Sequence, residues 1–514
     1  MTRATPEATQ KYSENFIRKG LPSTSYRKLG RTGLTTSTLG FGCYRIDDLN
    51  PVYRQSLELA ILEGINLIDT STNYTDGGSE RCVGRSLSLL FDSHKVTREQ
   101  IIVVTKVGYV QGENLKIAIA KEREGNAYPE MVRYADGCWH CIHPGFINDQ
   151  ITRSLSRMKL ECIDLLLLHN PEYYFSDALH RNAQASIADL RTLFYERIKR
   201  AFTQLEDEVE DGRIANYGVS SNTFGKYSEH GEMTSLHEMI RIAEEVAEKK
   251  YGNREAHHFS VAQLPMNLYE VGPVLELNND DDKKTTLTVA AENNIGVLVN
   301  RPLNAFVSNH LVRLADFETL DAKADRKDLL EELCRLEDDY AKHIAPLIPT
   351  EEGSTSAYDF FKWGPELVHF DSTTVGIEQW AQVEETMILP QVDNVVDTLD
   401  GFFESQDTAL WDTWRDKYLH CLTQILKITR AECGKRSQVM SDKTSKKLNT
   451  FIPKEWKGES LSRKSLAVLM NTKGVSCVLN GMRKPGYVAD SMGAMRLPPT
   501  EIPEKLYAHF KIEN

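Results

Sequence analysis

Short runs of consecutive aliphatic residues recur along the chain, and longer stretches in which apolar residues return every three or four positions separate them. A continuous apolar run is typical of a strand buried on both faces, as in a parallel sheet, and the longer spacing is typical of an amphipathic helix. The pattern predicts strands at 38–43, 65–70, 101–107, 162–169, 215–221, 259–265, 296–302 and 475–480. It predicts helices between most of them, at 51–63, 80–91, 147–159, 195–211, 234–250 and 285–294.

Strands that alternate with helices over such a length indicate a parallel sheet, and eight strands indicate a (β/α)8 TIM barrel in the α/β class. Gly64, Gly212 and Gly252 each follow a predicted helix, where a left-handed cap favours glycine. At 514 residues the chain is longer than one barrel of about 250 residues. We therefore expect one barrel with a large insertion.

Two predicted connections are unusually long. One runs from Gly108 to Gly145, and the other runs from Asn304 to about Leu461 after the seventh strand. The second contains large apolar residues at helical spacing, so we expect a mainly helical insertion rather than a disordered linker. We divide the chain into an N-terminal arm at 1–25, a first barrel part at 26–303, the insertion at 304–460 and the end of the barrel at 461–514.

Several predicted strands end in a polar residue that is capable of chemistry. Asp69 closes the second strand, and Tyr74 follows five positions later. Lys106 closes the third strand and His169 closes the fourth. All strand carboxyl ends of a barrel meet at one rim, so we expect these four side chains to converge.

These side chains together would suit the reduction of a carbonyl group. Lys106 can lower the pKa of Tyr74, and Asp69 can hold Lys106 charged and in place. His169 can bond a carbonyl oxygen and set its orientation, while Tyr74 donates a proton. None of the four can deliver a hydride, so a nicotinamide cofactor is implied.

A series of short strings surrounds these residues in a fixed order. They are Leu29-Gly30-Arg31-Thr32-Gly33-Leu34, Leu39-Gly40-Phe41-Gly42-Cys43, Asp69-Thr70-Ser71-Thr72-Asn73-Tyr74, Thr105-Lys106, Leu168-His169-Asn170-Pro171-Glu172, Gly218-Val219-Ser220-Ser221-Asn222, Gln263 to Asn267, Arg301-Pro302-Leu303 and Gly481-Met482-Arg483. In order and spacing the chain resembles the aldo-keto reductase superfamily, from about residue 26 to 303 and again from 461 to 496. The resemblance implies that the four residues above form a catalytic tetrad, and that residues 26–40 form a β-hairpin that closes the bottom of the barrel.

The resemblance also implies a cofactor, NADP(H) by preference with NAD(H) as an alternative. Ser221, Asn222 and Gln263 are expected to bond the carboxamide of the nicotinamide ring. Arg483 precedes a predicted helix, and both its guanidinium and the helix N-terminus would favour the 2′-phosphate of NADP. Arg301 stands near the place of a stacking tyrosine in many members, and we expect it beside the cofactor diphosphate or a substrate anion. The other expected cofactor contacts are Gly42, Cys43, Leu303, Gly481, Tyr487 and Asp490.

The string from Cys138 to His143, which reads Cys-Trp-His-Cys-Ile-His, has the CxxC spacing of a zinc site. No second well-spaced pair accompanies it, so we expect no metal, and a redox pair of Cys138 and Cys141 is an alternative. We expect this loop to line the substrate pocket through Trp139, together with Tyr173.

Composition narrows the class of partner. The formal net charge of −13 and the pI near 5.6 argue against nucleic acid or an anionic membrane. Nine largely unclustered cysteines are typical of reduced thiols, and we see neither a signal peptide nor a membrane-spanning stretch. We expect a cytoplasmic enzyme with a small-molecule substrate, and the oligomeric state stays open.

We expect the protein to reduce an aldehyde or ketone to an alcohol with NADPH. A tetrad of this kind works in both directions, so an NAD(P)⁺-dependent aldose or sugar dehydrogenase is an alternative. A third alternative, from a different class, is a regulatory subunit that binds nicotinamide and docks a partner protein through the insertion.

Overall fold

The computed structural model describes residues 2–307, 310–317, 326–349, 356–373, 376–404 and 409–511. The chain forms two compact units, a barrel unit of Met1–Ser308 with Phe451–Asn514 and an inserted unit of Asn309–Thr450. The first residues after Thr450, which we expected in the insertion, group with the barrel unit. The indole of Trp456 is buried there and donates to the carbonyl of Pro498 at 3.1 Å.

Eight parallel strands close into a barrel, and this confirms the predicted (β/α)8 TIM barrel. In order around the barrel they are β3 (Leu39–Gly42), β4 (Leu67–Asp69), β5 (Ile102–Val107), β9 (Ile163–His169), β10 (Ile214–Ser220), β11 (Phe259–Pro265), β12 (Gly296–Asn300) and β15 (Cys477–Gly481). Each strand lies inside its predicted range or extends one residue beyond it. All residues of β5 and β9 are buried, because one face of each strand packs inside the barrel and the other packs under helices.

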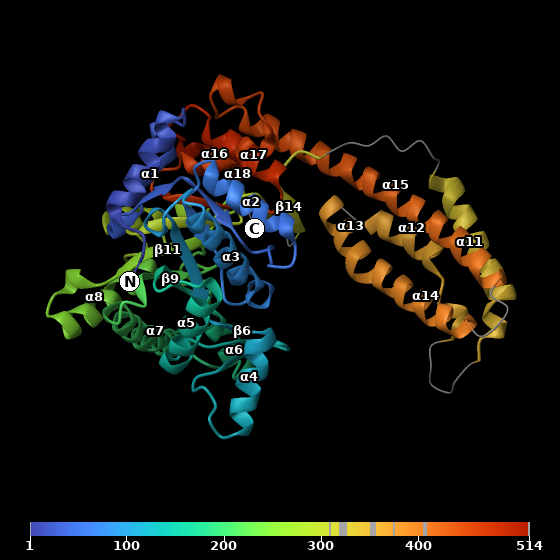
Figure 1. Cartoon of the computed structure of the whole chain (residues 1–514), viewed down its shortest axis with the longest axis horizontal. Helices are drawn as coiled ribbons and strands as arrows, with labels where there is room; N and C mark the ends of the chain where they lie inside the picture. Colours follow the sequence, from blue (N-terminus) through green and yellow to red (C-terminus); the bar gives the residue numbers. More distant parts are fainter. Residues whose placement is uncertain are drawn as a thin grey trace. The chain divides into compact units, whose positions relative to one another are not determined.

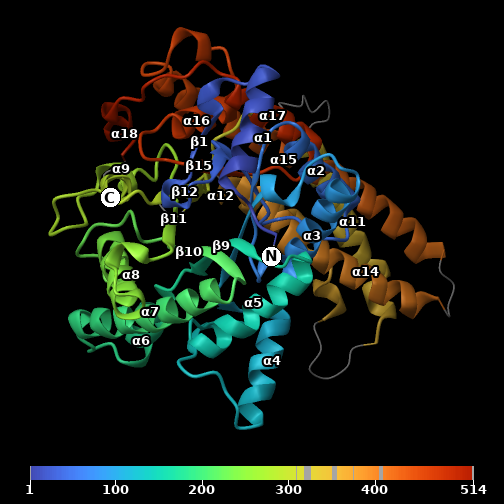
Figure 2. The same ribbon diagram turned by 60° about the vertical axis from the view of Figure 1, so that its left-hand side comes forward.

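Helices surround these strands on the outside (Figures 1 and 2). They include α2 (Pro51–Leu62), α3 (Gly78–Asp92), α5 (Pro144–Met158), α7 (Ile187–Glu210), α8 (Leu236–Tyr251), α10 (Thr286–Glu292), α16 (Leu461–Met470) and α17 (Pro485–Met495). Buried residues recur along one face of α7 from Leu190 to Leu205, as its apolar spacing predicts. Gly64, Gly212 and Gly252 have positive φ angles of 118°, 73° and 69°, so the predicted glycine caps are confirmed.

The first residues of the chain differ from the surface arm that we expected at 1–25. They contain helix α1 (Pro6–Arg18), in which Tyr12 and Phe16 are buried. The hydroxyl of Tyr12 donates to backbone carbonyls near the end of α2, one of them that of Ile65 at 3.1 Å. The apolar face of α1 is narrow, which explains why the spacing of apolar residues does not reveal the helix.

An antiparallel hairpin of β1 (Tyr26–Lys28) and β2 (Thr35–Ser37) follows α1. At its turn Gly30 has a φ of 50°, and a Cβ there would lie 2.3 Å from the amide nitrogen of Gly296. Gly296 begins β12, so the turn of the hairpin packs against the amino-terminal end of the barrel. The opposite, carboxyl end of the barrel stays free of the hairpin.

The long connection after β5 folds into a small sheet and one helix. Its elements are β6 (Tyr109–Val110), α4 (Gly112–Arg123), β7 (Val132–Ala135) and β8 (Cys138–His140), and β8 pairs antiparallel with both other strands. We call this segment the rim sheet, because it leaves the barrel at the carboxyl end of β5. The remaining α-helices and β-strands of the barrel unit are α6 (Tyr173–Arg181), α9 (Gly272–Leu275), β13 (Asn304–Val307) and α18 (Glu504–Phe510).

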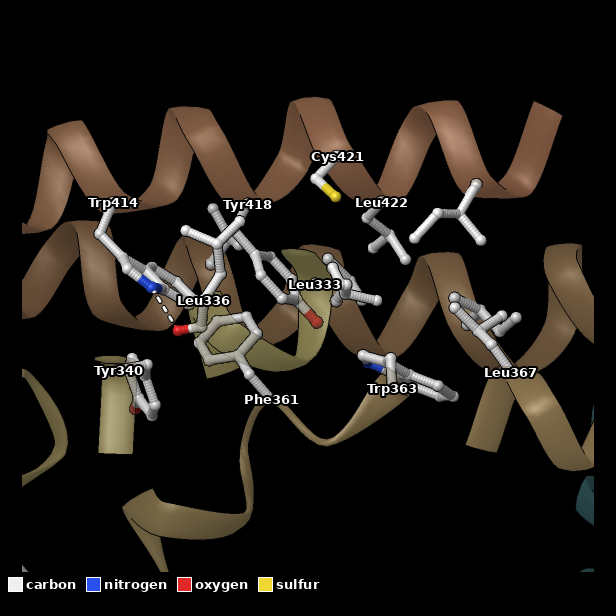
Figure 3. Close-up of a cluster of buried hydrophobic side chains, with 14 of the residues drawn as sticks. Leu333, Leu336, Tyr340, Phe361, Trp363, Leu367, Trp414, Tyr418, Cys421 and Leu422 are labelled. Atoms are coloured by element: carbon white, nitrogen blue, oxygen red, sulfur yellow. Dashed lines mark hydrogen bonds between the residues drawn. The ribbon is translucent and has the colours of Figure 1, made fainter. Parts of the chain in front are cut away.

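The inserted unit is mainly helical and has an apolar core of its own. It contains β14 (His310–Arg313), α11 (Arg326–His343), α12 (Trp363–Thr373), α13 (Ile377–Val383), α14 (Leu389–Phe403) and the 40-residue α15 (Ala409–Leu448). Trp414, Tyr418 and Leu422 of α15 point toward α11, and the indole of Trp414 donates to the carbonyl of Leu336 at 2.7 Å (Figure 3). Within the described ranges, no helix combines the length and apolar composition needed to cross a bilayer.

Close packing of α3 on α5 gives a test of the fold. A Cβ added at Gly84 of α3 would lie 2.7 Å from the carbonyl oxygen of Met158, at the end of α5. We expect Gly84→Ala to lower the free energy of unfolding by roughly 1–3 kcal/mol, since the backbone of α5 cannot move aside freely. Urea denaturation followed by circular dichroism measures the change.

Gly486→Ala in α17 is the matched control, because its added Cβ meets no described heavy atom within 4 Å. Its unfolding midpoint should stay the same or rise. An unchanged midpoint for Gly84→Ala would contradict the close approach of α3 and α5.

Candidate active site

The ammonium of Lys106 lies at the carboxyl rim of the barrel and is completely buried. It donates to Asp69 Oδ2 at 2.7 Å, to the carbonyl of Thr70 at 2.8 Å and to Tyr74 Oη at 3.2 Å. The strand register explains this meeting, because Asp69 of β4 is level with Val104 of β5, two residues before Lys106. The structure thus brings three of the four expected catalytic residues into direct contact.

A strained turn holds Tyr74 in this position. The next residues, Thr75 and Asp76, both have left-handed φ angles, of 48° and 52°, and Gly77 continues with 77°. Left-handed conformations in residues other than glycine cost about 1–3 kcal/mol each unless contacts enforce them. The carboxylate of Asp76 accepts a hydrogen bond from the amide of Glu113 at 3.1 Å, which ties the turn to the first turn of α4 in the rim sheet.

His169, the last residue of β9, completes the group. Its Nδ1 lies 3.1 Å from Ser71 Oγ, and its ring meets the ring of Tyr74 edge-on with centroids 5.9 Å apart. In the rim sheet, Nε2 of His140 donates to the backbone carbonyl of His169 at 2.6 Å. The imidazole is therefore fixed both through its side chain and through its backbone.

The surroundings set the protonation of each group. Burial raises the pKa of Tyr74 to about 12, while the ammonium of Lys106 acts in the opposite direction. The expected lowering by Lys106 is present, but burial outweighs it. Burial opposes the charge on Lys106, yet Asp69 and Tyr74 favour it, and its pKa lies above the ordinary value. Burial, with Lys106 and His140 nearby, holds the pKa of His169 well below its usual range.

At neutral pH the site therefore contains a protonated phenol, a charged amine and a neutral imidazole. A protonated phenol beside an ammonium can donate a proton to an oxygen that gains negative charge. The arrangement fits acid catalysis at a carbonyl group.

Two of the expected nicotinamide contacts are engaged within the protein. Gln263 donates to Asp69 Oδ1 at 2.8 Å and accepts from Ser220 Oγ at 3.0 Å. Ser221 Oγ lies 2.9 Å from the hydroxyl of Thr234. Gln263 therefore also orients the carboxylate that holds Lys106.

The third expected contact, Asn222, has a free side chain. Its backbone amide donates to Glu172 Oε1 at 2.8 Å, but its side-chain amide bonds to no residue in the described part of the chain. On β12, the Oδ1 atom of Asn300 is buried and likewise has no partner among the described residues. These atoms fit a ligand that carries hydrogen-bonding groups of its own.

Arg301 differs from our expectation of a cofactor or substrate anion. Its guanidinium donates to Glu270 Oε1 at 2.7 Å and lies over the ring of Phe306, 5.1 Å from the centroid. Its backbone is left-handed, with a φ of 52°. The charge that we expected to face a phosphate is thus already paired, and Leu303 follows in the same turn.

Of the residues expected to hold the adenosine end of the cofactor, some are free and one is already paired within the protein. Arg483 is partly exposed and has no hydrogen bond or ion pair with any described residue, and Tyr487 is 47% exposed. Helix α17 begins at Pro485 without a side-chain cap. The amide of Tyr487 donates to the carbonyl of Lys484 at 2.9 Å, but the amide of Gly486 has no described acceptor and is open to an anion. Asp490, by contrast, accepts from Arg463 at 2.9 Å and from Ser462 at 2.7 Å, so both of its oxygens are engaged.

Two expected contacts lie on neighbouring strands. Gly42 and Gly481 are paired at the carboxyl ends of β3 and β15, where the absence of side chains leaves the backbone accessible. Cys43 is fully buried, and its thiol donates to the carbonyl of Phe41 at 3.8 Å. The backbone of Cys43 is engaged too, since its amide donates to the carbonyl of Asp69 at 2.9 Å and its carbonyl accepts from Ser79 Oγ at 3.1 Å.

The two expected substrate contacts lie on different faces of the rim sheet. The hydroxyl of Tyr109 donates to Tyr173 Oη at 2.7 Å, and the ring of Tyr109 meets that of His169 edge-on at 4.6 Å. Tyr173 thus belongs to an aromatic group beside the site. Trp139 precedes His140 on β8 and so faces the other side, where the guanidinium of Arg133 covers its ring at 4.7 Å.

The cysteines of the zinc-like string are engaged separately. Cys138 Sγ lies 3.1 Å from Gln111 Nε2, whereas the buried Cys141 donates to the carbonyl of Pro129 at 3.6 Å. Among the residues that the structure describes, no group of three potential ligands is arranged for a metal ion. The histidine of this string, His140, instead supports His169.

Sequence reasoning missed three residues of the site: Tyr109, His140 and Glu172. The zinc-like spacing drew attention to the string around His140 for a different reason, and Tyr109 lay in a long loop without a pattern. Glu172 is 2% exposed, and its Oε2 atom has no described partner. Burial raises the pKa of Glu172 to about 7, against the opposite effect of the Asn222 amide.

The model of the aldo/keto reductase family matches residues 38–348, more than half of the chain. The chain belongs to the aldo/keto reductase family. Aldo-keto reductases use NAD(P)H, which agrees with the cofactor that we expected. The match begins at the first barrel strand and includes Asp69, Tyr74, Lys106 and His169.

Known relatives are identical to this chain at about a quarter of the aligned positions. The NADH-specific methylglyoxal reductase of Escherichia coli is 26% identical over 43% of this chain and 60% of its own length. The L-galactose dehydrogenase of Arabidopsis thaliana is 27% identical over 38% of this chain and 58% of its own length. The chain thus spans about 60% of the length of these relatives. A solved aldo/keto reductase from Klebsiella pneumoniae, in complex with NADP and acetate, has a TM-score of 0.41 and 13% identity over 95% of this chain and 94% of its own.

The buried carboxyl of Glu172 predicts a pH dependence of stability. Its pKa of about 7 exceeds the value of 4.5 in the unfolded chain, so the folded protein keeps a proton that the unfolded chain loses between these values. Stability should therefore fall by about 3 kcal/mol as the pH rises through this window, and then level off.

Glu172→Gln should remove that fall, because an amide keeps the carbonyl that accepts the amide of Asn222 but cannot ionise. Urea denaturation at pH 5 and pH 8 measures the difference between variant and wild type. Glu196→Gln, at an exposed position of α7, is the control. The same pH dependence in Glu172→Gln and wild type would show that Glu172 does not titrate in this way.

Proposed function

We propose that the protein is an oxidoreductase that reduces an aldehyde or ketone to an alcohol with NADPH. The observation that carries the proposal is the buried Lys106 ammonium, which contacts the carboxylate of Asp69 and the phenol of Tyr74 at the same time. Membership of the aldo/keto reductase family supports the same class of reaction. The bound cofactor would supply the hydride that no side chain can provide.

In this proposal Tyr74 donates the proton to the carbonyl oxygen. Its pKa of about 12 keeps the phenol protonated until charge develops on that oxygen. Lys106 then stabilises the phenolate that remains, and Asp69 balances the ammonium. His169, neutral and fixed at Nδ1, bonds the same oxygen and holds it beside Tyr74.

The free polar groups at the rim support a dinucleotide. Asn222 and Asn300 would hold the carboxamide of the nicotinamide, and Arg483 with the amide of Gly486 at the start of α17 would hold the phosphate of the adenosine end. An unpaired guanidinium favours NADP over NAD, because the 2′-phosphate adds charge that Arg483 can neutralise. The NADH-specific relative shows that family members differ in this choice, so NAD(H) is the alternative.

Sugar oxidation is the second candidate, and the similarity to an L-galactose dehydrogenase favours it. The same tetrad can accept a proton from an alcohol when the reaction runs backward, since proton transfer is reversible. Activity in both directions, on a panel of aldehydes and free sugars, separates the two candidates.

Replacement of the proton donor tests the proposal directly. Tyr74→Phe should lower kcat for carbonyl reduction by about 100-fold to 10,000-fold, because the ring stays and only the acid is lost. Cofactor affinity, measured by quenching of protein fluorescence, should change little.

The neighbouring Tyr44→Phe is the matched control. Tyr44 is 65% exposed and meets the ring of Tyr74 edge-on at 5.2 Å, but has no hydroxyl contact with Lys106. Full turnover in Tyr74→Phe would refute the assigned proton donor.

Removal of the free guanidinium tests the cofactor preference. Arg483→Ala should weaken NADPH binding by about 10-fold to 100-fold, the loss expected for one charged hydrogen bond. NADH binding should stay the same, since NADH lacks the 2′-phosphate. Arg496→Ala, at the other end of α17 and paired with Glu63, is the control. Equal losses for both cofactors would contradict a role for Arg483 in the choice.

A further inference from the structure

A line of polar side chains leads from His169 into the rim sheet. Its first two steps join His169 Nδ1 to Ser71 Oγ over 3.1 Å and Ser71 Oγ to Asn73 Oδ1 over 2.7 Å. The next two join Asn73 Nδ2 to Gln111 Oε1 and Gln111 Nε2 to the sulfur of Cys138, each over 3.1 Å. Four consecutive hydrogen bonds therefore connect the imidazole to a thiol on β8.

Gln111 takes part in this line although it stands at the N-cap of α4. Its side chain makes no capping bond to the helix. The carboxylate of Asp76 instead accepts from the amide of Glu113 in the first turn. The side chain of Gln111 is thus free to bridge Asn73 and Cys138.

Each group in the line fixes the direction of the next hydrogen bond. A half-turn of an amide exchanges its oxygen and nitrogen, so the same sites can hold the line in either of two directions. If Ser71 donates to Asn73, the proton of His169 must lie on Nδ1 and point at Ser71. If Asn73 donates to Ser71, then Ser71 donates to Nδ1, and the ring proton lies on Nε2.

Only the second direction suits a carbonyl substrate. The neutral ring of His169 carries a single proton, since burial holds its pKa well below the usual range. Nε2 has no hydrogen bond to any residue that the structure describes, so it is the nitrogen left to meet a substrate oxygen. A carbonyl oxygen only accepts, and Nε2 must therefore donate.

We propose that Asn73 and Gln111 are positioning residues that hold His169 in its Nε2–H form through Ser71, and that the thiol of Cys138 is the donor at the start of the line. The structure places the two amides in the opposite sense, with Ser71 donating to Asn73, Asn73 to Gln111 and Gln111 to Cys138. The proposed direction follows when both amides make a half-turn at the same sites, so that Cys138 donates to Gln111, Gln111 to Asn73 and Asn73 to Ser71. Burial raises the pKa of Cys138 and so keeps the hydrogen on sulfur. The consequence for catalysis rests on the proposed function, because the tautomer matters only if His169 bonds a carbonyl oxygen.

The position of the ring proton tests this proposal. Long-range ¹H–¹⁵N NMR spectra of protein labelled with ¹⁵N-histidine distinguish the two tautomers, and the spectrum of His169→Gln assigns the signals. We expect the proton of the wild-type protein on Nε2. In Gln111→Glu the new carboxylate only accepts, so Asn73 donates to it, Ser71 donates to Asn73, and the proton moves to Nδ1. Carbonyl reduction should then slow by roughly 100-fold, as expected when one donor to the oxyanion is lost.

Gln150→Glu is the matched control, because Gln150 and Asn114 form a buried amide pair, with bonds of 2.9 and 3.2 Å, outside the line. It should leave the proton of His169 on Nε2. Asn73→Asp gives the same reversal by a second route if Gln111→Glu does not fold. A proton on Nδ1 in wild type, or on Nε2 in both reversing variants, overturns the proposal. Absence of carbonyl reduction by wild type, together with the expected tautomers, would instead refute the proposed function.

Discussion

One buried ammonium, that of Lys106, organises the carboxyl rim of the barrel. A charge without solvent contact is tolerated only when opposite charge and hydrogen-bond acceptors surround it, and loss of the partner of a buried ion pair costs about 3–5 kcal/mol. Asp69, the carbonyl of Thr70 and the phenol of Tyr74 together provide that environment. Each of the three is therefore held within hydrogen-bond distance of one point. The need to stabilise a buried charge is what gives the site its geometry.

The same burial decides where protons reside. Low solvent access raises the pKa of Tyr74 to about 12 and lowers that of His169, although the two rings are in contact. The phenol stays protonated and the imidazole stays neutral for one physical reason, since burial disfavours the charged form of each. The pKa of Lys106 lies above its ordinary value because Asp69 and Tyr74 favour the ammonium more than burial opposes it. The same buried environment thus gives Tyr74, His169 and Lys106 different protonation states.

The rim sheet stabilises this arrangement from outside the barrel strands. Its α4 holds the left-handed turn after Tyr74 through the bond from Glu113 to Asp76, and its β8 holds the backbone of His169 through His140. Both contacts come from the same long connection, which follows β5. The long connection therefore belongs to the candidate active site, because its residues hold Tyr74 and His169 in position.

Patterns in the sequence determined the barrel and the identity of the four converging residues. Apolar runs mark strands buried on both faces, and parallel closure brings their carboxyl ends to one rim whatever the loops do. The tertiary structure alone decided which of the expected cofactor-binding residues already form ion pairs within the protein. Arg301 neighbours Glu270 and Asp490 neighbours Arg463, and these pairs join residues that no periodicity relates. It also decided the support of His169 by His140 and the narrow-faced helix around Tyr12, because contacts across long separations depend on packing rather than on local order.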